Sequence, residues 1–168
     1  IMALSLYTGS MYGTPVGGIV GFLDTNLVAA GWSIQASSGN LRRYAPGSST
    51  AIYGKFVLHV DDSATGSVNF RGVRDGVPYD PSNLLPVAAT TAEAYYCLGT
   101  ITDALGMPKS GTQSAPPLPP FYMYADASTA IILDTAQIPP ATVSWGFHYF
   151  GEYYSYTPGD VFKACGVG

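Results

Sequence analysis

The sequence has 168 residues, about the length of one domain, and 47% of them are hydrophobic, which provides a core and excludes an intrinsically disordered chain. Seven basic and eleven acidic residues give a net charge of −4, without the clustered Lys and Arg that direct nucleic-acid binding requires. No apolar run approaches the roughly 20 residues of a membrane-spanning helix and no secretory signal is visible, so we expect no membrane partner.

The N-terminal region is expected to form an extended arm followed by the principal helix. Residues 1–12 mix apolar side chains with Ser and Thr and predict the arm. Residues 16–30 carry apolar residues at three- and four-residue steps, which predicts a helix. Thr14 is its expected N-cap, Pro15 its first residue and Gly31 the left-handed residue after its end. The apolar stripe consists of Ile19, Val20, Leu23 and Leu27.

The rest of the chain alternates strand patterns with turn-forming residues. The predicted strands are 41–44, 52–60, 67–74, 121–125, 129–133 and 142–152. The turns at 61–66 and 126–128 are expected to close two hairpins, and 75–86 is expected to be a loop. Residues 88–98 fit a short helix or a strand equally well.

Together these elements predict a mainly β fold. We expect an antiparallel, sandwich-like single domain over residues 13–168, with one N-terminal helix packed on the sheet. A Pro-rich extended surface segment is expected at about 106–120, because proline cannot donate to a strand ladder. The predicted core consists of Phe56, Leu58, Val60, Val68, Phe70, Ile132 and Val143.

Candidate chemical groups near His59 favour a structural role. His59 lies close to Asp61 and Asp62, and a His–carboxylate pair is one way to begin a metal site. A metal site normally needs three or four converging ligands, however, and the two Asp residues open a hairpin loop, where side chains of this type are favoured. A small hydrolase built on His59 and Asp62 is a third, weaker alternative.

The aromatic segment WGFHYFG at 145–151 could stack on sugars or bases. It lacks the basic groove of single-strand binders, since no Lys or Arg follows it before Lys163, so a buried or interface strand is favoured.

Glycines at 13, 17, 18 and 21 precede the helix without the Gly-Lys-Ser/Thr ending of a phosphate loop. We therefore predict no catalytic residue, no bound cofactor and no metal.

The two cysteines, Cys97 and Cys165, form no CxxC or Cys/His pattern. They are expected to be reduced thiols, with a single disulfide as the alternative.

The composition favours a protein that works within an assembly. So few charged residues leave a largely neutral surface, and the 13 tyrosines suit protein–protein contacts. A small monomer with a plain surface remains the alternative.

Several short segments, in order from about Tyr7 to Asp160, resemble a family of tailed-bacteriophage virion structural proteins. They are FLDTNLV at 22–28 with Gly31-Trp32, Tyr44-Ala45, LHVDDS at 58–63 with Arg71-Gly72, FYMYAD at 121–126, YFGE at 149–152 and PGD at 158–160. The resemblance implies a non-enzymatic component of the particle, in the tail or baseplate or on the head surface. It implies no catalytic residues.

We expect the chain to be located in the virion as a homo-oligomer, in contact with copies of itself and other particle proteins. Its candidate interface residues are Tyr7, Tyr12, Pro116, Pro117, Pro119, Trp145, Tyr149, Tyr153 and Tyr154. The alternative is a carbohydrate-binding, host-attachment module that uses Trp145, Tyr149, Tyr153 and Tyr154.

Overall fold

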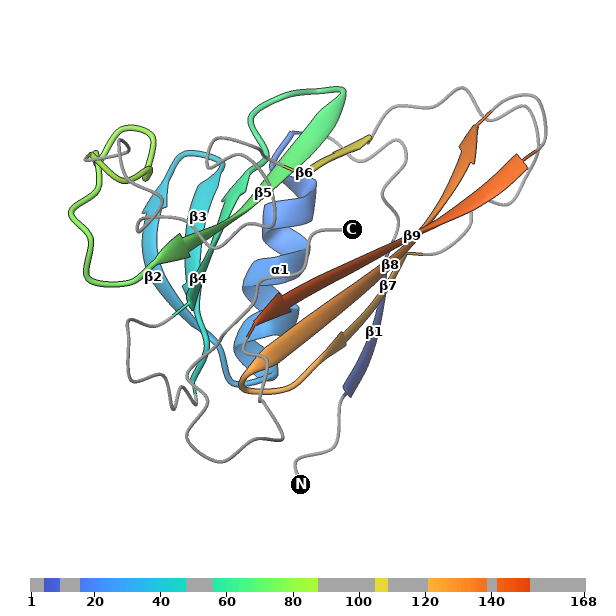
Figure 1. The fold of residues 1–168 in the computed structure, drawn as a ribbon, viewed down its shortest axis with the longest axis horizontal. Coiled ribbons are helices and arrows are strands. Elements are labelled where there is room, and N and C mark those ends of the chain that lie inside the picture. Colours follow the sequence, from blue (N-terminus) through green and yellow to red (C-terminus); the bar gives the residue numbers. More distant parts are fainter. Residues whose placement is uncertain are drawn as a thin grey trace, which may run out of the picture.

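The computed structural model describes residues 5–9, 16–47, 56–87, 105–108, 121–138 and 142–151, and it confirms the expected mainly β fold. Two antiparallel sheets hold the strands, and the helix α1 (Gly18–Ala29) lies between the sheets (Figure 1). Within these residues, no helix has both the length and the apolar character needed to cross a membrane.

The first sheet has four strands in the order β1-β7-β8-β9. They are β1 (Ser5–Gly9), β7 (Phe121–Ala125), β8 (Thr129–Ile138) and β9 (Thr142–Gly151). β1 pairs with β7 over its whole length, so residues 5–9 of the expected arm form an edge strand of this chain's own sheet. The expected hairpin turn at 126–128 joins β7 to β8 and is confirmed.

The second sheet has five strands in sequence order. They are β2 (Ser33–Ser38), β3 (Leu41–Ala45), β4 (Phe56–Asp61), β5 (Ser67–Arg74) and β6 (Leu105–Pro108). The expected β4–β5 hairpin and the expected loop after it are confirmed. β2 and β6 are two strands that the sequence patterns did not predict. The expected start of the Pro-rich surface segment is wrong, because residues 106–108 pair with β5 as part of β6. The rest of that segment, residues 88–98 with Cys97, and Cys165 lie outside the described residues.

The predicted start of the helix is wrong. α1 begins at Gly18, and its N-cap is Gly17, whose φ of 79° is left-handed, so Thr14 and Pro15 lie before the helix rather than in its cap and first turn. The cap comes from far along the chain: the N–H groups of Ile19 and Val20 donate to Asp62 Oδ2 at 2.9 and 3.2 Å. The predicted end is confirmed, because Gly31 follows Ala30 with a φ of 101°.

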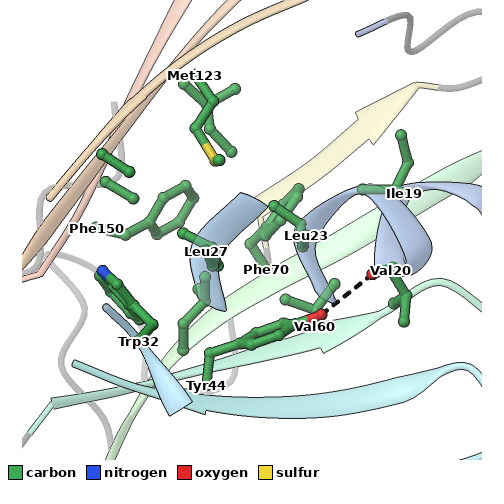
Figure 2. Close-up of a cluster of buried hydrophobic side chains, with 14 of the residues drawn as sticks. Ile19, Val20, Leu23, Leu27, Trp32, Tyr44, Val60, Phe70, Met123 and Phe150 are labelled. Atoms are coloured by element: carbon green, nitrogen blue, oxygen red, sulfur yellow. Dashed lines mark hydrogen bonds between the residues drawn. The ribbon is translucent and has the colours of Figure 1, made fainter. Parts of the chain in front are cut away.

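The core lies where α1 meets both sheets (Figure 2). The apolar stripe of the helix is buried as predicted, and so are five of the predicted core residues in the sheets: Leu58, Val60, Val68, Phe70 and Ile132. The side chains of Phe56 and Val143 lie outside the described part of the structure. Phe70 of one sheet and Phe150 of the other have ring centroids 5.2 Å apart, which joins the two sheets directly.

Polar contacts fix α1 on β3. Arg42 donates to Asp24 through Nε and Nη2 at 3.1 to 3.2 Å, and the Tyr44 hydroxyl lies 2.8 Å from Asp24 Oδ1. The same hydroxyl lies 3.3 Å from the carbonyl oxygen of Val20 (Figure 2). Burial, followed by the hydrogen bond to Asp24, raises the pKa of Tyr44 above its ordinary value, so the phenol remains protonated and available to donate.

Replacing Leu23 by Asp tests whether α1 depends on docking between the sheets. Leu23 is completely buried, so Leu23→Asp places an unpaired charge in the core and should lower the free energy of unfolding by about 3 kcal/mol or more. Thr25→Asp on the exposed side of the same helix is the control and should change it by less than about 0.5 kcal/mol. Equal thermal melting of the two variants would contradict the docked helix.

Replacing Asp62 tests the long-range helix cap. Asp62→Ala leaves two buried N–H groups without their acceptor and should cost about 2 kcal/mol in urea unfolding. Asp62→Asn retains an oxygen that can accept these bonds and should cost less. If both variants lose the same stability, the carboxylate does not act as a cap.

Candidate functional site

The structure separates the residues predicted to form an interface. Tyr7 of β1 is half-buried and packs against the core cluster, whereas Tyr149 of β9 lies on the opposite face of the same sheet. Trp145 lies in β9 opposite Thr135 of β8, and its side chain is outside the described part. The other predicted interface residues also lie outside the described residues: Tyr12, Pro116, Pro117, Pro119, Tyr153 and Tyr154.

The strand register defines an outer face on the four-stranded sheet. Residues directly opposite one another on neighbouring strands point to the same side of a sheet, and the side alternates along each strand. Met123, Ala125, Ala130, Ile132 and Phe150 point into the core, so the residues between them point outward. We call this outward surface the tyrosine face; its members are Leu6, Thr8, Tyr122, Tyr124, Ile131 and Tyr149.

The tyrosine face carries no charged residue. Leu6 is 53% exposed, while Tyr122, Tyr124 and Tyr149 are half-buried. Tyr149 is partly held in place, because its hydroxyl lies 3.3 Å from Thr129 Oγ1. Tyr122 and Tyr124 were not selected from the sequence as interface residues. The available signal was the alternation in FYMYA, where buried Met123 and Ala125 require both tyrosines to point away from the core.

Most charged side chains whose burial is described have a hydrogen-bond partner within the protein. Nine have a described burial, and none of the nine is exposed: Asp24, Arg42, Arg43, Asp61, Asp62, Arg71, Asp75, Asp80 and Asp126. All except Arg71 have a hydrogen bond to another group of this chain. Among the residues whose burial is described, every exposed one is therefore uncharged; the side chains of Arg74 and Asp134 lie outside this set.

A second polar cluster lies on the outer face of the five-stranded sheet. Arg43 of β3 is opposite His59 of β4, and His59 is opposite Arg71 of β5, so these three side chains form a row across the sheet. Arg43 and His59 are buried, and Arg71 is half-buried. The sequence placed His59 on the face away from Leu58, but it contained no signal that this face is covered as well.

The loop at 75–87 covers this row. Arg43 donates from Nη1 to the carbonyl oxygen of Leu84 at 3.1 Å, and its guanidinium lies 4.4 Å from the ring centroid of Tyr79. His59 Nε2 is 2.9 Å from the carbonyl oxygen of Asn83. At the rim, Gln35 accepts from Arg43 Nε at 3.0 Å and donates to Asp75.

The protonation state of His59 follows from these contacts. A carbonyl oxygen can only accept, so Nε2 carries the ring proton in this bond. The other ring nitrogen, Nδ1, is buried without a hydrogen-bond partner in the structure. Burial is the main cause that lowers the pKa of His59 to about 4, so the ring is neutral at pH 7. Burial also lowers the pKa of Arg43.

The residues near His59 are not arranged as a metal site or a hydrolytic pair. Asp62 accepts from the N-terminus of α1, and Asp61 accepts from Ser63 N and Oγ. No group of three or more His, Cys, Asp or Glu side chains in the described ranges is placed to hold a metal ion. The contacts of His59 and Arg43 hold the 75–87 loop on the sheet.

Comparison of the chain with protein-family models, with curated proteins and with solved structures finds no match.

Replacing Arg43 tests its role in holding the loop. Arg43→Ala leaves Gln35 Oε1 and the Leu84 carbonyl without their donor and removes the contact with Tyr79. We expect it to lower the free energy of unfolding by about 2 to 3 kcal/mol. Arg71→Ala, on the same face of the sheet, is the matched control and should cost less than about 1 kcal/mol. If urea titrations give the same loss of unfolding free energy for both variants, the contacts of Arg43 with the loop do not stabilise the fold more than Arg71 does.

Proposed function

We propose that this chain is a non-enzymatic structural subunit of a tailed-bacteriophage particle. It lies in the tail or baseplate or on the head surface, and it acts through symmetric contacts with copies of itself and with other particle proteins. Its location in this proposal is the virion.

The observation that carries the proposal is the absence of charge among the exposed residues whose burial is described. Exposed charges keep small proteins soluble and separate, because they are strongly hydrated and repel like-charged copies. Here the described charged groups form helix caps, turns and contacts between elements, so they contribute to folding. A surface of this kind is suited to being covered by other subunits.

The tyrosine face is the best described contact surface for such subunits. Tyrosine is enriched in protein interfaces, since its ring buries a large apolar area while its hydroxyl finds a polar partner. A two-fold axis brings the residues that lie close to it near their own copies, so a charged residue there would meet a like charge. Leu6, Tyr122 and Tyr124 can be covered by a second copy without that cost.

The resemblance to the phage family supports the same proposal. Its described motifs lie in and just after α1, in β3, at the end of β4, in β5, in β7 and at the end of β9, which are elements that build the core or its polar supports. The resemblance therefore falls on elements that build the fold, and it implies no reactive site.

Self-association tests the contact surface. We expect light scattering of the purified chain to give an oligomeric mass, and Leu6→Asp or Tyr124→Asp to weaken association at least about tenfold. Thr65→Asp, in the exposed β4–β5 loop, is the control and should leave the mass unchanged. A wild-type chain that stays monomeric at high concentration, alone and with particle proteins, would contradict the proposal.

Two further measurements separate the remaining parts of the proposal. Density for this fold in a map of the whole particle would support the virion location, and its absence from purified particles would contradict it.

A glycan array tests the carbohydrate-binding alternative, which the clustering of tyrosines on one sheet face also fits. Strong sugar binding that Trp145→Ala abolishes would favour that alternative.

A further inference from the structure

We propose that the 75–87 loop is an acid-released cover, which leaves the sheet when His59 gains a proton between Arg43 and Arg71.

The position of His59 makes its protonation unfavourable while the loop is closed. Arg43 and Arg71 are its direct cross-strand neighbours, one on each side. Side chains at such positions lie about 5 Å apart at Cβ, and like charges placed there repel. A protonated His59 would therefore be the middle member of a row of three cations.

Hydrogen bonding disfavours the protonated ring as well. Nε2 already donates to the Asn83 carbonyl, so the added proton goes to Nδ1. Nδ1 is buried and has no hydrogen-bond partner in the structure. The closed loop would then enclose an unpaired N–H donor on a charged ring.

The acidic groups around the row compensate only in part. Asp61 lies two residues along β4 and attracts a proton on His59, but its carboxylate already accepts from Ser63. Asp75 of the loop acts mainly on Arg43 and is bonded to Gln35 and to the N–H of Gly76. Tyr79 of the loop covers Arg43 rather than His59.

The net result is that burial, with contributions from Arg71 and Arg43, lowers the pKa of His59 to about 4, against the hydrogen bond to Asn83 and the attraction of Asp61.

The closed loop contains one residue with an unfavourable backbone conformation. Leu84 has a φ of 59°, in the left-handed region that branched side chains rarely occupy. Its side chain is buried and its carbonyl accepts from Arg43, so these contacts maintain the unfavourable backbone. Away from this residue, Ser38 Oγ donates to the Ser82 carbonyl at 3.3 Å. Weakening the contacts with the row allows Leu84 to relax, which favours release.

Proton linkage gives the size and direction of the effect. His59 in a released loop regains its ordinary pKa of 6.5, whereas in the closed loop the pKa is about 4. The released state therefore binds more protons, and its population rises as the pH falls from 6.5 toward 4. Between pH 8 and pH 5 the ratio of released to closed loop should increase about 30-fold.

Hydrogen exchange of the wild-type chain measures this ratio. In the closed loop the amides of Asp80, Leu84 and Val87 donate to the carbonyls of Leu85, Asp80 and Pro78. These bonds lie within the loop, and they report its release because the released loop loses the contacts with the sheet that hold it folded. After correction for the intrinsic effect of pH on exchange, the opening constant of these amides should rise about 30-fold from pH 8 to pH 5. The amides of α1 report global unfolding, and their opening constants should not rise together with those of the loop.

Two variants separate the proton on His59 from other effects of acid. His59→Gln retains an amide donor for the Asn83 carbonyl but cannot be protonated, so loop opening in this variant should be independent of pH. Arg71→Met removes one of the two charges beside His59 from a half-buried position. It should reduce the rise of the loop-opening constant between pH 8 and pH 5 while leaving the fold intact. The proposal is overturned if the wild-type loop opens equally at pH 8 and pH 5, if Arg71→Met retains the full increase, or if α1 opens together with the loop.

Discussion

The rest of the structure depends on the bond between Asp62 and the first turn of α1. The helix starts at a left-handed glycine, and its early N–H groups are buried, so an acceptor must come from another element. Asp62 also donates its backbone N–H to Asn40 and accepts from Gly17 N, so the β2–β3 turn, the β4–β5 loop and the start of the helix meet at one residue. Since Leu23 and Leu27 are buried only when α1 lies between the two sheets, this junction determines which side chains form the core.

The same principle explains how a chain with so few charges uses them. Asp24 and Arg42 connect α1 to β3, Asp126 closes the β7–β8 turn, and Arg43 connects β3 to the 75–87 loop. Each contact stabilises a junction between elements, where backbone groups would otherwise lack partners. The consequence is that, among the residues whose burial is described, the exposed ones are uncharged.

Local patterns predicted most of the fold, while contacts distant in sequence were not predictable. The apolar stripe of α1, the β4–β5 hairpin and the β7–β8 turn depend on neighbouring residues, and all three are present as predicted.

The N-cap was predicted from Thr14 because capping is usually local, whereas Asp62 lies more than 40 residues away from the groups it caps. β2, with the sequence SIQASS, was missed because its side chains are largely exposed and its register shifts near Gln35, so no apolar alternation marks it. The tyrosine face was partly predictable, since alternation along β7 determines its direction, but the pairing of β1 with β7 brings Leu6 to it from the other end of the chain.

β4 shows why the covered polar row is more than a structural support. The inner face of this strand presents Leu58 and Val60 to the helix, an arrangement that is insensitive to pH. Its outer face presents His59 between two arginines beneath a loop, although apolar side chains of similar size could fill that space without burying ionisable groups. Replacement of buried ionic groups by apolar ones is often neutral or stabilising, so stability alone does not account for a histidine at this position. A histidine there makes the attachment of the loop conditional on protonation, whereas an apolar residue would make it permanent.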